Sequence, residues 1–534
     1  MKFERGREVP GGSVLTTDVC VIGSGAAGIT VARELDGSSL QVLVLEAGGL
    51  EHDPVAEADT YAIDQLGIPY LSTIPNRGRW FGGSTSLWFG RIAMLDPIDL
   101  EARAWVRDSG WPLTIEQLHP WVPRAAAILD VPHIEKLKIQ NWPQNPTIDT
   151  FAGTGGAGLG VFLWADGMFM GERQRARLEA SPNVRVLLDA TATQFVPNEG
   201  SSAIDTLEVC GAPGTRFSVR ASTYVLAAGG LENPRLLLAS TARSPEGVGN
   251  GEDLVGRYYL DHPRGEGLAT VDLRNLAPGQ IERLLLLGEK SKSEYGKVQL
   301  RVTFPEALQR DESLLNHSLH AHLVAEIHNA PGYIAARRLV ERLRNRQQGA
   351  RGDVRADAIA VAKGGPQLLR LGARQVRGRS QPSELVVIDQ MEQEPDPDSR
   401  VTVDHRRLDR YGLPRLQVDW RVGSSTYRSQ RRMHRMFGDI LGRVGITTFR
   451  SQVLERPDEQ PEVWDMKHPS GTTRMSNSPK HGVVDADSRV HGLANLYVAG
   501  SSTFPTAGHA NPTLLIVALA ARLADHLRRT APPH

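Results

Sequence analysis

A glycine-rich turn near the N-terminus constrains the fold of this chain more than any other feature. The apolar run 18–22, rich in β-branched residues, leads directly into Gly23-Ser24-Gly25-Ala26-Ala27-Gly28, and a helical pattern continues to Leu35. At these spacings the first glycine permits a tight turn, the second lets the backbone approach a pyrophosphate, and the third lets the helix pack closely on the strand. The pattern predicts a βαβ unit that holds a dinucleotide at the N-terminus of its helix.

The next strand supports the same interpretation. It spans 40–45 and ends in Glu46, about 20 residues beyond the last glycine, where a carboxylate accepts hydrogen bonds from a ribose. A second match to the glycine spacing, at 153–158, follows the segment 142–146 (Trp-Pro-Gln-Asn-Pro) and no strand, so we interpret it as a flexible loop. The glycine pattern alone does not distinguish NAD from FAD.

The length and composition of the chain exclude several classes of protein. Its 534 residues are too many for one compact core and predict two closely associated domains, or one with inserts. Lys and Arg (61) balance Asp and Glu (61), which disfavours general binding to nucleic acid. The two cysteines, Cys20 and Cys210, lie in apolar runs and predict inert core positions, with no disulfide framework or cysteine-rich metal site. The sequence has neither a signal peptide pattern nor an apolar run long enough for a membrane span, which predicts a cytoplasmic protein.

Three further segments appear in a fixed order after the glycine turn. They are Arg79-Trp80-Phe81-Gly82-Gly83-Ser84-Thr85, the stretch 224–234, and the C-terminal block from His468 to Asp525. Together with the turn they resemble the glucose–methanol–choline (GMC) family of flavin oxidoreductases. The resemblance covers the start of the chain, the region around 180–265 and roughly the last 150 residues. The sequence around Asn511 is most similar to that of pyranose oxidases and of bacterial sugar and polyol dehydrogenases.

This resemblance implies an α/β fold (α+β overall) with a Rossmann-like FAD-binding domain and a substrate-binding domain built on a β-sheet with helices. The FAD-binding domain is expected to be discontinuous, over 14–105, 180–262 and 455–534, with a linking insert at 106–179 and the substrate-binding domain at 263–454. The residues that the resemblance places around FAD are Gly23, Ser24, Gly25, Ala26, Ala27, Gly28, Glu46, Ala47, Trp80, Gly82, Gly83, Ser84, Gly500, Ser501, Asn511 and Thr513.

The attachment of the flavin is a separate question. Some members of the family bind it covalently through a histidine in the loop that runs along the flavin. The corresponding stretch here, 84–88, contains no histidine, and Leu87 occupies the aligned place. We therefore expect FAD to be bound noncovalently.

The resemblance also implies a catalytic pair. His468 lies in the segment that carries the family's catalytic histidine, and Asn511 lies in the segment that carries its partner. His468 would take the hydroxyl proton as hydride leaves carbon for flavin N5, and Asn511 would hold the alcohol oxygen. An imidazole is neutral near pH 7 and an amide donates without competing for the proton. Asn511 also suits a helix N-cap before Pro512, and His509 is a rival partner or a substrate contact.

The middle of the chain is expected to form the substrate side. The stretch 386–394 fits a strand that faces the active site, and its polar residues are candidates to bind hydroxyl or amino groups, although solvated charges at a sheet edge explain them equally well. They are Asp389, Gln390, Glu392 and Glu394. If several of them face inward, the substrate is cationic, for example an amino sugar. Arginines at 337, 338, 342, 344 and 346 favour a solvated helix, with docking to a membrane surface or an electron-accepting partner as the alternative.

These observations predict an FAD-dependent oxidoreductase without a metal. It would oxidise a primary or secondary alcohol of a sugar, glycoside or amino sugar to the carbonyl, and pass electrons to oxygen or another acceptor. Two alternatives remain: oxidation of a simpler alcohol such as a polyol or a sterol, and a lyase on the same scaffold in which FAD is structural.

Overall fold

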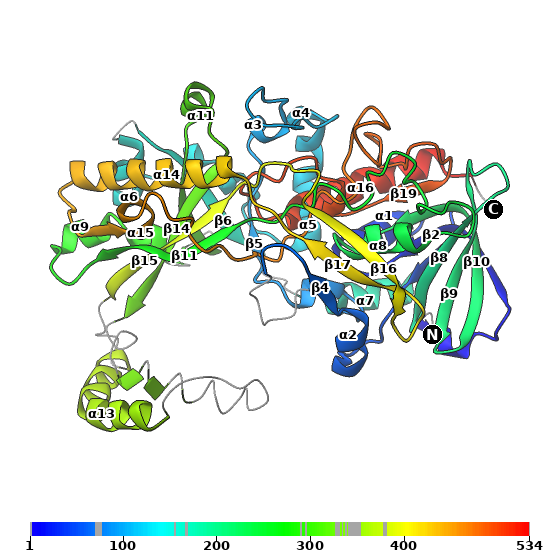
Figure 1. Ribbon diagram of the computed structural model, residues 1–534, viewed down its shortest axis with the longest axis horizontal. Coiled ribbons are helices and arrows are strands. Elements are labelled where there is room, and N and C mark those ends of the chain that lie inside the picture. The colour runs from blue at the N-terminus through cyan, green and yellow to red at the C-terminus, as the bar shows by residue number, and fades with distance from the viewer. Residues whose placement is uncertain are drawn as a thin grey trace.

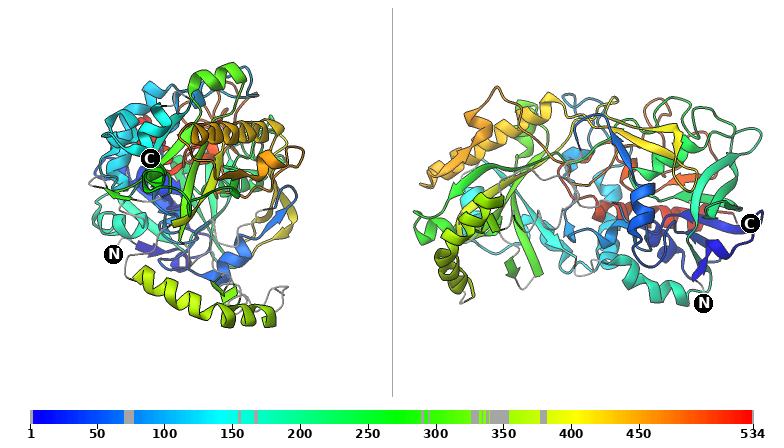
Figure 2. Two further views of the ribbon diagram at one scale, coloured as in Figure 1. Left: turned by 90° about the vertical axis from the view of Figure 1, so that its left-hand side faces the viewer. Right: turned by 60° about the horizontal axis from the view of Figure 1, so that its bottom comes forward.

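Two large β-sheets lie toward opposite ends of an elongated molecule (Figure 1). This is a computed structural model, and it describes residues 3–69, 77–153, 156–165, 169–288, 291–293, 296–325, 354–376 and 382–532, together with a few positions between 332 and 339. Both ends of the chain lie beside the first sheet (Figures 1 and 2). The predicted α/β architecture is confirmed.

The first sheet grows from the glycine turn. Its parallel core comprises β1 (Phe3–Arg5), β7 (Val184–Leu188), β3 (Val42–Leu45), β2 (Val14–Ile22), β10 (Thr215–Leu226) and β19 (Leu496–Val498). Two antiparallel strands, β9 (Ile204–Ala212) and β8 (Thr191–Pro197), extend it beyond β10. The sheet therefore joins strands that are far apart in the sequence, and β1 adds an edge strand ahead of the expected start at residue 14.

Helices α1 (Ala26–Leu35) and α16 (Thr513–Thr530) pack against each other over one face of this sheet. Val19 and Val21 of β2 point into the core on that face, whereas Cys20 and Ile22 point into a second core on the other face. Because both faces are covered, the strand is apolar at every position rather than at alternate ones. Burial raises the pKa of the Cys20 thiol, as befits an inert core residue.

The second sheet is antiparallel throughout. Its order is β18 (Phe449–Ser451), β11 (Arg264–Asp272), β15 (Pro382–Met391), β14 (His317–Ala325), β13 (Gly296–Thr303), β6 (Gly158–Trp164) and β5 (Arg91–Ile92), with β12 (Ser291–Ser293) beside β13. Strands β5 and β6 come from segments that we had assigned to the FAD-binding domain and to the linking insert. The second glycine pattern hid β6, because Gly153 ends helix α6 (Pro146–Gly153) and Gly158 begins the strand; Thr154 and Gly155 lie outside the described residues.

Helix α14 (Ser424–Arg443) covers one face of the second sheet (Figure 1). Its buried apolar residues recur at helical spacing, as in Met433, Phe437 and Ile440, so the helix presents one apolar stripe to β14 and β15. The opposite face of the sheet is left to line the space between the two sheets. Polar side chains on the second sheet therefore reach the site only from the face that is not covered by α14.

A small third sheet connects the two parts. It contains β16 (Arg400–Leu408), β17 (Pro414–Asp419) and β4 (Ile63–Gln65), and it packs through Trp420 and Tyr259. Helix α13 (Val354–Val376) projects from the second sheet (Figures 1 and 2). The predicted helix with arginines 337, 338, 342, 344 and 346 lies outside the described residues. Within the described part of the chain, none of the helices has the length and apolarity that a bilayer crossing requires.

The close packing of α1 on β2 generates a stability prediction. A Cβ atom on Gly28 would lie 1.9 Å from the carbonyl oxygen of Gly23, so Gly28→Ala forces the helix away from the turn. We expect the free energy of unfolding, measured by urea denaturation, to fall by about 3 kcal/mol. Gly251→Ala is the matched control, because its Cβ meets nothing within 4 Å and its stability should stay within about 0.5 kcal/mol of the parent. Equal stability of the two variants would contradict the packing role of Gly28.

Candidate active site

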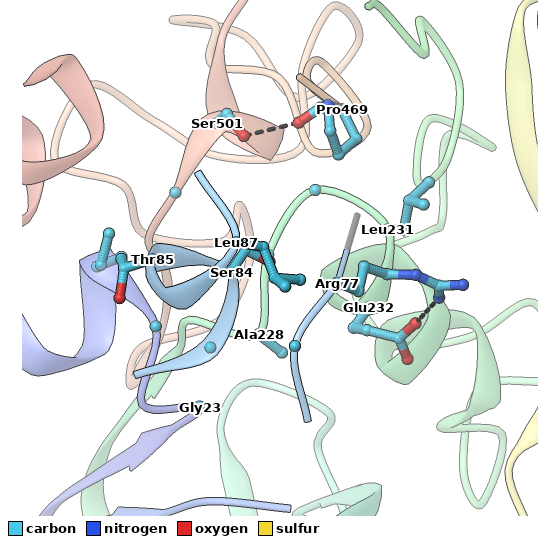
Figure 3. A pocket seen from close by; sticks show the side chains of 18 of the residues that line it. Gly23, Arg77, Ser84, Thr85, Leu87, Ala228, Leu231, Glu232, Pro469 and Ser501 are labelled. Carbon is cyan, nitrogen blue, oxygen red and sulfur yellow. Dashed lines mark hydrogen bonds and ion pairs between the residues drawn. The ribbon is translucent and has the colours of Figure 1, made fainter. Parts of the chain in front are cut away.

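A cavity of about 680 Å³ runs from the glycine turn to the second sheet. Figure 3 shows part of its lining, with Ser84, Thr85 and Leu87 near the centre of the view, Gly23 below them and Ser501 above. Its wall is tied together by hydrogen bonds such as that from the Ser501 hydroxyl to the Pro469 carbonyl, 2.7 Å. The predicted site residues that line it are Gly23, Ser24, Gly25, Ala26, Ala27, Glu46, Ala47, Gly83, Ser84, His468, Gly500, Ser501, Asn511 and Thr513.

At the glycine-turn end, Glu46 is fixed by the turn itself. One carboxylate oxygen accepts the Ser24 hydroxyl at 2.5 Å and the Ser24 N–H at 3.2 Å, and the other accepts the Gly48 N–H at 2.8 Å. Glu46 is buried but reaches the cavity wall. Because its position is set before any ligand arrives, it presents acceptor oxygens in a defined place.

Three residues that we expected around the cofactor do not line the cavity. Gly28 packs against the turn as described above, and Trp80 lies against the His52 ring, with centroids 4.9 Å apart. The Gly82 N–H donates to the Ser24 carbonyl at 3.2 Å, which fixes the second loop to the first. These residues shape the wall without forming its surface.

At the other end, the predicted pair comes together. The Asn511 side-chain nitrogen lies 3.4 Å from Nε2 of His468, although the two residues belong to different segments. Asn511 precedes Pro512, which is the N-cap of α16 and makes no side-chain capping bond. The Asn511 side chain instead contacts His468 and the Gln390 amide, whose nitrogen lies 3.4 Å from the Asn511 oxygen. Gln390 thus orients Asn511 so that its N–H₂ group faces the imidazole.

Sequence analysis missed His262, which holds His468 from behind. The two Nδ1 atoms are 2.9 Å apart, and Nε2 of His262 lies 3.2 Å from the Ala507 carbonyl oxygen. A carbonyl only accepts, so His262 carries its proton on Nε2 and its Nδ1 is an acceptor. His468 then donates from Nδ1, which leaves its Nε2 lone pair directed at Asn511 and the cavity. The signal in the sequence was the run Asp261-His262-Pro263, which no pattern ties to residue 468.

Asp261 fixes the backbone of both histidines. Its carboxylate accepts the N–H groups of His262 (2.7 Å), Met466 (3.1 Å) and His468 (3.1 Å). Asp261, His262 and His468 also form a cluster of potential metal ligands within 4.8 Å. Two nitrogens on one tetrahedral zinc lie about 3.3 Å apart, wider than the observed 2.9 Å between the Nδ1 atoms. The cluster fits a hydrogen-bonded chain better than a metal site.

The residues expected to contact substrate, His509, Gln390, Glu392 and also Glu394, do not line the cavity among the described residues. Gln390 acts behind Asn511, as described. Glu392 is fully buried in a bidentate pair with Arg103. His509 is held between Arg301, 2.7 Å away, and Asp96, 3.2 Å away, so it does not replace Asn511 beside His468.

Asp389 points away from the cavity for a simple geometric reason. Successive side chains of a strand face opposite sides of the sheet, and Asp389 of β15 faces α14. There it accepts from His317 at 3.0 Å, His434 at 2.9 Å and Gln430 at 2.8 Å. The condition for a cationic substrate, several inward-facing carboxylates on this strand, is therefore not met.

The chain is similar in sequence and in fold to known oxidoreductases. The family model described as GMC oxidoreductase matches residues 395–520. The large subunit of fructose dehydrogenase from Gluconobacter japonicus is 26% identical over 58% of this chain and 47% of that subunit. The 6'''-hydroxyparomomycin C oxidase of Streptomyces lividus is 25% identical over 98% of this chain and 94% of the oxidase. In structure, pyridoxine 4-oxidase from Mesorbium loti shares the fold, with a TM-score of 0.58, 18% identity, and coverage of 96% of this chain and 99% of the oxidase.

Residues 395–520 thus carry a GMC oxidoreductase domain, and the whole chain has the fold of GMC oxidases. The match to this family implies a flavin cofactor, and the cavity fits one. A Cβ atom on either Gly25 or Gly229 would project into open space, and both glycines line the cavity. Larger side chains there would fill the room that a pyrophosphate and a flat ring system need. The N-terminal ends of α1 and α16 reach the same cavity and favour negative charge there.

The electrostatics of the histidine pair keep it neutral. Burial lowers the pKa of His262 to about 4. Burial, and after it the neighbouring His262 and the Arg91 guanidinium, hold the pKa of His468 well below its usual range. At pH 7 the imidazole of His468 is therefore unprotonated at Nε2, the state that a proton acceptor requires.

Proposed function

We propose that this protein binds FAD noncovalently and oxidises an alcohol of a sugar or glycoside to the carbonyl. The observation that carries the proposal is the position of a neutral imidazole, His468, 3.4 Å from the Asn511 amide and in the same cavity as the glycine turn. Two relatives are named for fructose and for 6'''-hydroxyparomomycin C, which supports a sugar-like alcohol.

The cofactor would occupy the length of the cavity. Ser24, Gly25 and Ala26 at the start of α1 would hold the pyrophosphate, and Glu46 would accept from a ribose. Ser84, Gly500 and Thr513 line the part nearer His468, where the ring system would lie. When bound, the flavin supplies the hydride acceptor, a chemistry that no side chain offers.

The side chains of the chain supply the proton chemistry. His468 would take the hydroxyl proton at Nε2, and Asn511 would donate an N–H to the alcohol oxygen and hold it beside the imidazole. As His468 becomes charged, its Nδ1–H bond to His262 strengthens, because the donor is then an imidazolium. His262 is thus a positioning residue that fixes the tautomer and the direction of the base.

The role of His468 predicts a specific loss. His468→Ala should keep its flavin but reduce the rate of anaerobic flavin reduction by substrate by about 10²- to 10⁴-fold, because no other group takes the proton. In the parent, this rate should rise with pH through a midpoint below 6.5, since the pKa of His468 is lowered and the unprotonated form is the active one. His481→Ala, at an exposed histidine, is the control and should behave as the parent. Normal single-turnover reduction in His468→Ala would refute the assignment.

A matched pair of substitutions tests His262. An asparagine retains an oxygen acceptor near the place of Nδ1, whereas the isosteric leucine does not. We expect His262→Leu to slow flavin reduction at least about 10-fold at saturating substrate, and His262→Asn to recover most of the rate. Flavin content and thermal stability are measured in parallel. Equal loss of rate in both variants would mean that the imidazole serves packing alone.

The absence of a histidine in the stretch 84–88 predicts how the cofactor is held. Acid precipitation of the purified protein should release all of the yellow chromophore into the supernatant, because Leu87 cannot form a bond to the flavin. The absorbance of supernatant and pellet near the flavin maximum measures the split. Flavin retained in a denatured pellet would contradict noncovalent binding.

A further inference from the structure

The second sheet contributes a basic wall to the cavity. Its lining residues among those the structure describes are Arg91 of β5, Trp164 of β6, Arg264 of β11 and His322 of β14. None of these four is a carboxylate. In the register of the sheet, Arg264 lies opposite Gln390, the residue that contacts Asn511. Arg264 therefore faces the same side as the catalytic pair, away from α14.

Arg91 is a largely buried cation that has no counter-charge among the described residues. Its guanidinium donates to His320 at 2.9 Å and lies 4.7 Å from the Phe162 ring centroid and 5.3 Å from that of Trp164. In the part of the chain that the structure describes, no carboxylate lies within 4 Å of it. Burial, and after it Arg264 and Arg301, lower the pKa of Arg91 to about 10, so the group is still charged at pH 7. Since a buried charge is costly without an opposite charge, this position suits an anionic ligand.

Arg264 and Lys467 add two more cations to the wall of the cavity that contains the base. The Arg264 backbone pairs with Trp464, four residues before His468, through N–H···O bonds of 2.8 and 2.9 Å. Its guanidinium contacts Glu266 at 2.6 Å, but that pair is about one third exposed and is weakened by solvent. Lys467 directly precedes His468 and lines the cavity.

Most acidic residues near this end of the cavity interact with other side chains and do not line the cavity. Asp465 lines the cavity beside Lys467. Asp389 accepts hydrogen bonds on the side of the sheet that faces α14, and Glu392 forms an ion pair with Arg103. At the end of the cavity that contains His468, the lining among the described residues therefore includes three cations (Arg91, Arg264 and Lys467) and one carboxylate, that of Asp465.

We propose that the substrate carries an anionic group, a carboxylate or a phosphate, which Arg91 and Arg264 bind while its alcohol meets His468. The substrate class is then a sugar acid or a sugar phosphate rather than a neutral or amino sugar. A guanidinium suits both groups, because its fork of N–H donors matches two oxygens of either. This inference rests on the proposed function, because it concerns the substrate of the same site.

The first test compares sugars that share a ring and its stereochemistry but carry a neutral, a cationic or an anionic substituent. D-Glucose, D-glucosamine, D-glucuronate and D-glucose 6-phosphate, with their galacto and manno counterparts, are titrated into the flavin-loaded enzyme by calorimetry and then tested for anaerobic flavin reduction. We expect the best anion to bind about 10- to 100-fold more tightly than its neutral counterpart, the amino sugars to bind most weakly, and the preference to shrink as salt is raised. The glucuronate and phosphate arms decide between the two anions.

Substitutions locate the effect. Arg91→Met should abolish the preference for the anion. Arg264→Met, at a more exposed position, should weaken the preference even if Arg91→Met folds poorly. Arg406→Met is the control, because that side chain is 91% exposed in the third sheet. Equal or tighter binding of neutral or amino sugars, or an anion preference that survives both substitutions, would overturn the inference. Anions that bind through Arg91 without any alcohol bleaching the flavin would instead refute the proposed oxidation and leave the anion site standing.

Discussion

The carboxylate of Asp261 joins the two chain segments from which the base is built. It accepts N–H groups from the start of the second-sheet segment, at His262, and from the loop that carries Met466 and His468. The N–H of His262 is buried and those of Met466 and His468 are partly buried, so all three would lose a partner in a poorly solvated place without it. Asp261 fixes the backbone of both histidines. The 2.9 Å contact between their Nδ1 atoms therefore depends on Asp261. The direction of the His468 lone pair is in turn a consequence of that contact.

The exclusion of water from this region, which makes Asp261 necessary, also determines the protonation state of His468. Water would compete for Nδ1 of His468 and raise the pKa of the imidazole toward its usual value. The chain of hydrogen bonds from the Ala507 carbonyl through His262 instead assigns one tautomer, and the nearby Asp261 carboxylate accepts backbone N–H groups and not a ring nitrogen. A neutral histidine behind a neutral histidine gives orientation without the strong electrostatic pull of an aspartate. The base is therefore well aimed but remains a weak acceptor until its surroundings change.

Sequence reasoning succeeded where a local pattern carries its own geometry. The glycine turn, Glu46 and the segment before α16 are each short runs whose spacing specifies what the backbone does, and the structure places all three on one cavity. Sequence reasoning failed where the register of a β-sheet determines which way a side chain faces. Whether Asp389 faces α14 or the cavity depends on the register of β15, and a shift of one residue would have reversed the outcome. His262 and Arg91 were missed because their partners, His468 and His320, are more than 200 residues away in the sequence.

The basic wall and the weak base form one electrostatic unit. The charge of Arg91 is one of the causes that lower the pKa of His468, so any anion that neutralises this guanidinium also removes part of that depression. With the proposed anionic substrate in place, the pKa of His468 rises, and the imidazole becomes a stronger acceptor when the alcohol lies beside it. A neutral sugar would leave Arg91 uncompensated and the base weak. The site would then discriminate between substrates by the basicity of His468 as well as by affinity, because the same charge controls both.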